Sequence, residues 1–313
     1  MIRSYPHADA PWSGAIWIDL CDATDDERAQ IERITGLRVP TKPAVSEIET
    51  SSRVFTENGA LYLSTPLPSS GDARSSLTAA GFVLTRHLLL TVRFAENPVF
   101  EALYASCVKT GPHSACDVFL RILEALVDRS ADTLEHTSAE LDVLSQRAFH
   151  AERARSGKLK EASESLRQAL RKLGQMGDFI SQIRDTLLGL GRIAGFVTET
   201  GDAVLAAPDV PRLKAVRADI SSLNDYQSHL SGKVQFLLDA TLGFINIEQN
   251  DIVKILTIVS VVGVPPVLIA GIYGMNFKHI PEFDWSLGYP YALALMVVTG
   301  LAPLAWFKWR GWM

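Results

Sequence analysis

Residues 255–273 read ILTIVSVVGVPPVLIAGIY and contain no charged side chain. A helix needs about 20 consecutive apolar residues to cross the hydrocarbon core of a bilayer, so this run has the length of one membrane span. A second uncharged run, YPYALALMVVTGLAPLAWF, occupies residues 289–307. Trp and Tyr side chains near the ends of these runs are typical of membrane–water interfaces. Two buried helices of a soluble protein are the alternative, but two full-length runs favour two membrane spans.

The charges beside the two runs predict their orientation. Lys254 precedes the first run, and the second is followed by the tail KWRGWM at residues 308–313. Basic residues favour the cytoplasmic side of a membrane. The first residues, MIRSYPHADAPWSG, lack the apolar core of a signal peptide. We therefore expect a multi-pass protein of the cell (inner) membrane with cytoplasmic N- and C-termini and an external loop at residues 274–288.

The region before the first span, residues 131–254, predicts long helices. A helix over residues 131–173 is loosened at Gly174 and Gly177, and a second covers residues 178–197. The last helix begins near Pro211 and meets no further proline until Pro265, so with the first span it covers about 60 residues, or about 90 Å. This suggests a stalk. Its apolar residues recur every three or four positions, as in a coiled coil: Leu213, Val216, Ile220, Leu223, Tyr226, Leu230, Val234, Leu237 and Ile245.

Residues 1–130 predict a cytoplasmic α/β domain. A short apolar strand at residues 15–20 precedes a helix that runs to Thr35 and stops at Gly36. Strands at residues 53–56 and 60–66 flank Asn58-Gly59, a strong hairpin signal. A second strand pair is expected at residues 81–85 and 88–92, followed by helices near residues 98–107 and 115–127.

The predicted fold class is therefore an α/β cytoplasmic domain plus a long stalk helix and two C-terminal transmembrane helices. Its segments are residues 1–130, 131–254, 255–273, 274–288, 289–307 and 308–313.

Composition excludes several other classes of protein. The formal net charge of −5 over 313 residues gives nucleic-acid binding no electrostatic support. The three cysteines lack the spacing of a disulfide framework. The group Cys107, His113 and Cys116 lacks a fourth ligand for zinc, so we expect buried free thiols there.

The junction after the first run carries a recognisable motif. Residues 271–277 read GIYGMNF, and Pro281-Glu282 follows in the loop. Gly-Met-Asn after the first of two C-terminal spans resembles the signature of the CorA magnesium transporter family. Residues 17–20, 45–52 and 59–62 also resemble family sequence, so the resemblance spans nearly the whole chain.

The resemblance implies a funnel-shaped homopentamer in which five first-span helices surround a central pore. Such proteins pass Mg²⁺, often Co²⁺ and Ni²⁺ too, and Mg²⁺ bound between cytoplasmic domains holds the pore closed. A sister branch of the same architecture moves Zn²⁺. The intact Gly-Met-Asn tripeptide favours the magnesium branch, and no organic cofactor is expected.

In such a pentamer, Gly274, Met275 and Asn276 would form the selectivity filter. Asn276 would offer amide carbonyls to a hydrated ion, Gly274 would allow a sharp turn, and Met275 would pack to hold that turn. A plain helix C-cap is the alternative interpretation, since Gly and Asn favour helix ends.

Helical spacing back from the filter gives a stripe that matches the family's pore-lining residues by position. Within it, Asn250 would make a polar ring at the cytoplasmic entrance, while Val253 and Leu256 would make a hydrophobic constriction. Relatives often carry Met or a hydroxyl residue where this chain has Val264 and Val267. Lipid-facing or helix-packing surface is the alternative for the apolar members. The stripe comprises Asn250, Val253, Leu256, Ser260, Val264, Val267 and Gly271.

Three acids complete the candidate site. Glu282 and Asp284, in the external loop, would form an acidic mouth that concentrates cations. Asp239 matches by position an acid that binds regulatory Mg²⁺ in relatives, and Asp72 is a candidate partner only by its rough region. Each of these acids has a plain alternative as a solvated side chain.

Two rival functions remain. A zinc transporter of the same architecture is the first, although the pore stripe contains neither Cys nor His. A membrane-anchored cytoplasmic enzyme is the second. The sequence contains no P-loop, nucleophile elbow, dinucleotide fingerprint or HExxH motif, so we expect that the protein is not an enzyme.

Overall fold

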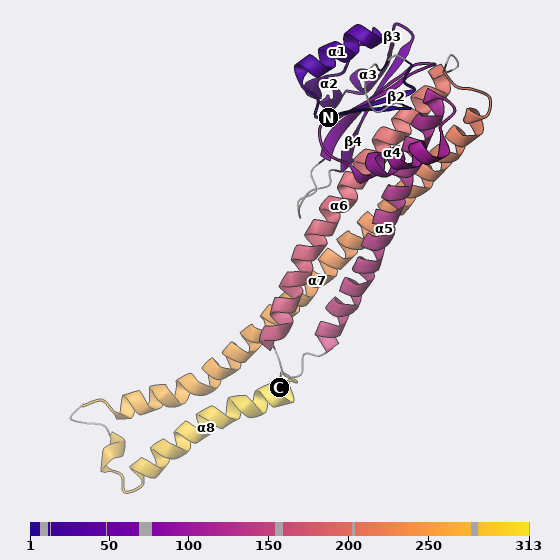
Figure 1. The fold of residues 1–313 in the computed structure, drawn as a ribbon. Coiled ribbons are helices and arrows are strands. Elements are labelled where there is room, and N and C mark those ends of the chain that lie inside the picture. Colours follow the sequence, from indigo (N-terminus) through magenta and orange to yellow (C-terminus); the bar gives the residue numbers. More distant parts are fainter. Residues whose placement is uncertain are drawn as a thin grey trace. The chain divides into compact units, whose positions relative to one another are not determined.

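The computed structural model describes residues 1–6, 12, 14–47, 49–68, 77–153, 159–201, 204–276 and 281–312 (Figure 1). The chain divides into two compact units, and each is described by itself. The first comprises Met1–Phe149 and Gln168–Leu238, and the second comprises His150–Arg167 and Asp239–Met313. Helix α7 (Asp209–Tyr273) contributes residues to both units without a break in its helical structure.

The first unit is built on a six-stranded mixed sheet. Strands β2 and β6 pair in parallel, and every other neighbouring pair is antiparallel. Strands near residues 15–20, 53–66 and 81–92 were predicted and are confirmed, while β1 was not predicted. In spatial order the strands are β1 (Ile2–Tyr5), β2 (Trp17–Cys21), β6 (Leu89–Arg93), β5 (Leu77–Leu84), β4 (Ala60–Pro68) and β3 (Val54–Glu57).

Alternating side chains give the sheet two apolar faces, and each face contributes to a separate core. Ile18 and Leu20 of β2 point to one face and pack with Ile31 of helix α1 (Asp25–Thr35). Trp17 belongs to the other face and packs in a core with Phe119 of α5. The helices that contribute to this core are α4 (Pro98–Thr110), α5 (Ala115–Arg153), α6 (Leu159–Thr200) and α7.

Local signals place several of these elements where the sequence predicts them. Thr24 and Glu27 form a capping box at the start of α1, and Gly36 ends that helix with a φ of 69°. Asn58 and Gly59 also have positive φ and join β3 to β4. Two short helices, α2 (Lys42–Ser46) and α3 (Thr50–Arg53), precede this hairpin. The predicted capped helix and Asn-Gly hairpin are both confirmed.

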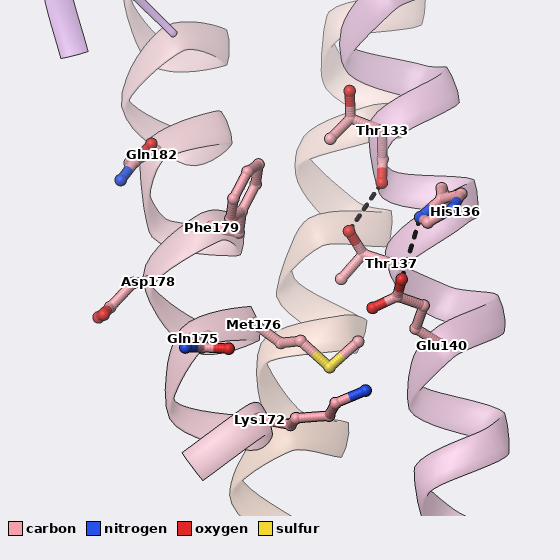
Figure 2. A pocket seen from close by; sticks show the side chains of 10 residues that line it. All are labelled: Thr133, His136, Thr137, Glu140, Lys172, Gln175, Met176, Asp178, Phe179 and Gln182. Atoms are coloured by element: carbon pink, nitrogen blue, oxygen red, sulfur yellow. Dashed lines mark hydrogen bonds and ion pairs between the residues drawn. The ribbon is translucent and has the colours of Figure 1, made fainter. Parts of the chain in front are cut away.

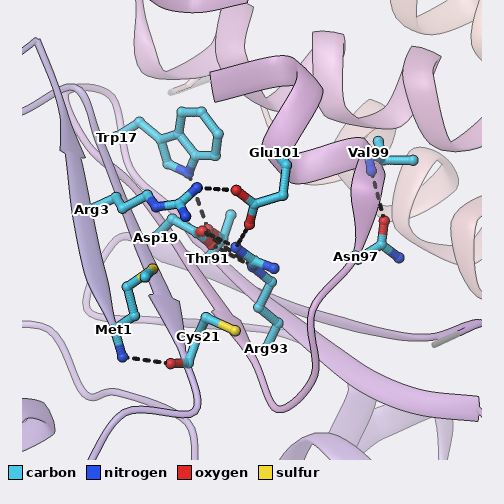
Figure 3. Close-up of polar contacts among 10 residues, drawn as sticks. All are labelled: Met1, Arg3, Trp17, Asp19, Cys21, Thr91, Arg93, Asn97, Val99 and Glu101. Carbon is cyan, nitrogen blue, oxygen red and sulfur yellow. Dashed lines mark hydrogen bonds and ion pairs between the residues drawn. The ribbon is translucent and has the colours of Figure 1, made fainter. Parts of the chain in front are cut away.

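A buried polar network ties the sheet to α4 (Figure 3). The Arg93 guanidinium donates to both carboxylate oxygens of Asp19, with its Nη2 2.7 Å from Asp19 Oδ2. Both side chains are only 4% exposed. Arg93 Nη2 also donates to Glu101 of α4 at 2.9 Å, and Thr91 Oγ1 donates to Asp19 at 2.6 Å. Two oppositely charged residues on neighbouring strands therefore neutralise each other inside the domain.

Helices α5, α6 and α7 run side by side and share an apolar core that includes Leu141, Ile180 and Val234 (Figure 1). The prediction that the first long helix is loosened at Gly174 and Gly177 is wrong, because both glycines lie inside α6. α5 also continues through residues 128–131, where two separate helices were expected. A Cβ at Gly177 would lie 3.7 Å from Val234 Cγ1, an ordinary van der Waals distance, so this position of α6 lies against α7.

The start of α7 is held by an ion-pair network. Arg212 donates to both carboxylate oxygens of Glu124 at 3.0 and 2.8 Å and to Asp117 at 2.8 Å. Burial opposes ionisation of the Asp117 carboxyl, but hydrogen bonds from Arg121, Arg212 and the backbone of His113 outweigh it and lower the pKa of Asp117 to about 2. Asp117 therefore stays ionised and fixes the first turn of α7 to α5.

The cysteines behave as predicted. Cys107 and Cys116 are buried free thiols, while His113 is exposed. Burial and the neighbouring Asp209 raise the pKa of Cys116 to about 12, so its thiol is protonated at neutral pH.

The second unit contains residues 239–273 of α7, the short 3₁₀ helix η2 (Pro281–Asp284) and helix α8 (Gly288–Trp309). Both α7 and α8 include a window long and apolar enough to cross a membrane, and none of the residues in the α7 window is buried. The alternative of two buried core helices is therefore wrong for α7. The long uninterrupted stalk-and-span helix is confirmed, with 65 residues.

Candidate ion pathway and selectivity filter

One face of the membrane part of α7 packs against α8. Its half-buried residues include Ile258, Val262, Pro266 and Ile269, which recur every three or four positions. A Cβ at Gly300 of α8 would lie 3.5 Å from Pro266 Cγ and 3.8 Å from the Val262 carbonyl oxygen. These are ordinary van der Waals distances, so Gly300 lies directly against α7.

Pro265 and Pro266 lie inside the membrane part of α7. Neither proline has a backbone N–H, so the carbonyl groups of Val261 and Val262 lose their usual helical donors. The chain remains helical through both positions.

The predicted pore stripe lies on the opposite side of α7. At about 100° per residue, the centre of the stripe is roughly 180° around the helix from the residues that face α8. Val264 is 61% exposed and Val267 is 72% exposed, although both are apolar. The structure thus leaves an apolar face uncovered within one chain. Every member of the predicted stripe is exposed: Asn250, Val253, Leu256, Ser260, Val264, Val267 and Gly271.

The Gly-Met-Asn tripeptide stands directly after the last helical residue, Tyr273. The Gly274 N–H donates to the Ala270 carbonyl at 2.9 Å, and the Met275 N–H donates to the Ile272 carbonyl at 3.2 Å. Helix α7 therefore ends in a tightened turn that presents the next residue, Asn276, beyond its end.

Gly274 has tight surroundings but no unusual backbone angle. It is not among the described glycines with positive φ, so a left-handed C-cap does not form here. A Cβ at this position would lie 3.1 Å from the Ala270 carbonyl oxygen, which already accepts the Gly274 N–H. Met275 is 47% exposed and Asn276 is exposed in the single chain, so both side chains are available to other copies.

The loop acids lie on η2, directly before α8. Asp284 is exposed and Glu282 is half-buried. Gly288 fixes the turn between η2 and α8, because a Cβ there would lie 2.1 Å from the Glu282 carbonyl oxygen. This close contact holds the backbone of the acidic turn against the first residue of α8.

The predicted regulatory acid, Asp239, is exposed on α7, and its candidate partner Asp72 lies outside the described residues. Among the residues that the structure describes, no group of three or more His, Cys, Asp or Glu could hold a metal ion.

An open cleft of about 830 Å³ lies between α5 and α6 in the first unit (Figure 2). On one side, His136 Nδ1 lies 3.7 Å from Glu140 Oε1, both on α5 and both exposed, and Lys172 and Phe179 of α6 line the other. Asp178 points away from α5. The lining of this cleft includes the cation Lys172 as well as the carboxylate Glu140. It therefore differs from a divalent-cation site, whose ligands are oxygen atoms.

These observations define a membrane protein with two C-terminal spans, an exposed stripe along the first span and a Gly-Met-Asn turn at its end. A family model described as CorA-like Mg²⁺ transporter protein matches residues 12–309. The chain therefore belongs to the CorA family, whose members are transporters rather than enzymes. This confirms the sequence resemblance.

Relatives with known names match almost the whole chain. The magnesium transport protein CorA of Escherichia coli (strain K12) is 32% identical over 306 residues, which cover 97% of this chain and 93% of that protein. The corresponding protein of Salmonella typhimurium is 32% identical over 303 residues, covering 96% and 92%.

Solved structures show the same fold. The complete CorA magnesium transporter from Methanocaldococcus jannaschii matches with a TM-score of 0.75 and 21% identity, covering 95% of this chain and 91% of that chain. The full-length CmaX protein matches with a TM-score of 0.65 and 16% identity, covering 95% and 88%. The predicted combination of an α/β domain, a long helix and two C-terminal spans is thus confirmed.

Proposed function

We propose that this chain is one subunit of a homopentameric channel that passes divalent cations, chiefly Mg²⁺, across the cell (inner) membrane. Co²⁺ and Ni²⁺ are further substrates in this proposal. The observation that carries it is the exposed stripe of α7, which faces away from α8 and leads to the Gly-Met-Asn turn. Relatives at 32% identity are named magnesium transport proteins.

The proposed pathway uses the stripe as the wall of the pore. Five copies of Asn276 would surround the ion with amide oxygens, which suit a cation that keeps its water shell. Such oxygens bind an ion without the full charge that would trap it. Val253 and Leu256 would form an apolar constriction that can close by dewetting, and Asn250 would form a polar ring before it.

The acids would act at the two ends of the pathway. Glu282 and Asp284 would concentrate cations at the external mouth. Asp239 would hold regulatory Mg²⁺ between subunits on the cytoplasmic side, where both termini are placed in this proposal. Without that ion, like charges on adjacent subunits would repel each other and favour opening.

The test is ion flux into proteoliposomes containing the full chain, with Mg²⁺ and Zn²⁺ measured separately. Wild type should pass Mg²⁺, and Asn276→Ala should abolish most of that flux. Asn224→Ala, the same chemical change on a part of α7 remote from the span, should leave flux unchanged. Native mass spectrometry of each variant checks that the assembly is intact.

Two results would contradict the proposal. If Mg²⁺ flux is equal in wild type and in Asn276→Ala, Asn276 does not form the selectivity filter. Zn²⁺ flux without Mg²⁺ flux would place the protein with the zinc transporters of the same architecture.

A further inference from the structure

The end of α8 is an ordered turn rather than an unstructured tail. The Trp312 N–H donates to the Phe307 carbonyl at 3.0 Å, and the Gly311 N–H donates to the Lys308 carbonyl at 3.1 Å. Gly311 has a φ of +74°, and the Trp312 ring stacks on Phe307 with centroids 5.5 Å apart. These bonds and this apolar contact make a Schellman motif. We call residues 306–312 the tail turn.

The tail turn presents basic and aromatic groups to its surroundings. Trp309 is 83% exposed, and Trp306, Lys308 and Arg310 are also exposed. The Arg310 guanidinium lies over the Trp306 ring, 5.5 Å from its centroid. Within the described part of the chain, neither Lys308 nor Arg310 forms an ion pair. The turn therefore holds two cations whose N–H groups remain available to a further anion.

The length of α8 fixes the depth of this turn in the membrane. With 22 residues, α8 is about 33 Å long and matches the thickness of a bilayer core, about 30 Å. Its two ends therefore reach the two interfaces. Tyr289, 77% exposed, and Trp285 give the other end aromatic groups as well.

Charge distinguishes the two ends. The η2 end carries the acids Glu282 and Asp284, whereas the tail turn carries Lys308 and Arg310. Trp and Tyr favour any lipid–water interface, but only the basic end complements a negatively charged headgroup. A phosphodiester accepts hydrogen bonds from guanidinium and ammonium groups, and the cation–π contact with Trp306 orients Arg310 for that role.

We propose that the tail turn is a binding site for the phosphodiester headgroup of anionic phospholipids, such as phosphatidylglycerol, in the leaflet at that end of α8. The site depends on the membrane spans and not on ion transport, so its test is independent of the flux test above.

The experiment uses native mass spectrometry to count lipids bound to the full chain in detergent, after addition of phosphatidylglycerol or phosphatidylcholine. Wild type should bind phosphatidylglycerol in preference. Lys308→Gln with Arg310→Gln should weaken that binding roughly a hundredfold, at about tenfold for each charge-assisted hydrogen bond to the headgroup that is lost. Lys308→Arg with Arg310→Lys keeps both charges and should keep most of the affinity.

Lys254→Gln is the matched control, because it removes one cation beside the other span and should leave phosphatidylglycerol binding unchanged. Addition of inorganic phosphate distinguishes a lipid site from a general anion site, and it should not displace the lipid. Four results would each overturn the proposal. Wild type could bind the two lipids equally, or the double Gln variant could bind phosphatidylglycerol as well as wild type does. Lys254→Gln could lose as much affinity as the double Gln variant, or inorganic phosphate could displace the lipid.

Discussion

Removing one partner of the buried pair Asp19–Arg93 should destabilise the α/β domain strongly. In Asp19→Ala, the Arg93 guanidinium loses its hydrogen bonds to the carboxylate, and the Thr91 hydroxyl loses its acceptor. Arg93 keeps one partner, Glu101, at 2.9 Å. The variant therefore leaves a buried cation that is only partly neutralised, which is the costly situation for an ion pair in a protein interior.

The size of the effect follows from this arrangement. Breaking a buried pair by removing one partner costs about 3–5 kcal/mol. Glu101 is 41% exposed and compensates in part, so we expect the lower end, about 3 kcal/mol. At about 2–4 °C per kcal/mol for a domain of this size, the melting temperature should fall by roughly 6–12 °C.

Thermal unfolding of the full chain in detergent, followed by circular dichroism, measures this shift. Asp25→Ala is the matched control, because Asp25 pairs with Arg28 on the surface and its side chain is 89% exposed. It should melt close to wild type. Asp19→Leu combined with Arg93→Met replaces the pair by apolar groups and should recover most of the loss. A double variant that melts below Asp19→Ala would refute the reasoning.

Two further predictions concern the same domain. The pKa of Asp117 is lowered from 3.8 to about 2, so its ion pairs contribute their full stabilisation above about pH 4. The melting temperature should therefore fall as the pH drops from 4 to 2. Asp117→Asn should flatten that part of the plot of melting temperature against pH. In Gly189→Ala, the new Cβ would lie 2.1 Å from Thr65 Oγ1, so melting should fall, whereas Gly195→Ala on the same helix meets nothing within 4 Å and should raise it. Unchanged melting in both glycine variants would contradict this account of α6 packing.

The elements that local signals determine were predictable from the sequence. The capping box at Thr24 and the Asn58-Gly59 turn act within a few residues, so their outcome depends little on the rest of the fold. The same is true of the two apolar runs, whose length and lack of charge suffice to identify them. These local signals were enough to predict the two spans and several of the elements before them, but not β1, α2 or α3.

The glycines of α6 show where local reasoning failed. The prediction failed at Gly174 and Gly177, because a glycine weakens a helix by about 1 kcal/mol relative to alanine and so suggests a break. In the structure both glycines lie inside α6, and the neighbouring side chains Leu173, Met176 and Ile180 pack into the core shared with α5 and α7. The packing of these neighbours outweighs the low helix propensity of the two glycines, and it cannot be known from one helix alone.

The Asp19–Arg93 pair was missed for a related reason, although it left a signal. Each charge stands in a strand that is otherwise apolar, WIDLC and LLTVR. A buried charge requires a partner of opposite sign. Which partner it takes depends on the parallel register of β2 and β6, which joins strands far apart in the sequence. The requirement for a partner was therefore predictable, but its identity was not.

The middle of the proposed pore is apolar, and this limits how an ion could cross it. Between Ser260 and Gly271 the stripe carries only Val264 and Val267, over about 16 Å at 1.5 Å per residue. Neither side chain can replace a water ligand of Mg²⁺, an ion that dehydrates reluctantly. The ion would therefore have to cross this length with its hydration shell intact. When water leaves this apolar section, the ion could not cross it. Selection among cations would then fall to Asn276, because that ring is where polar side chains meet the hydrated ion before the apolar section begins.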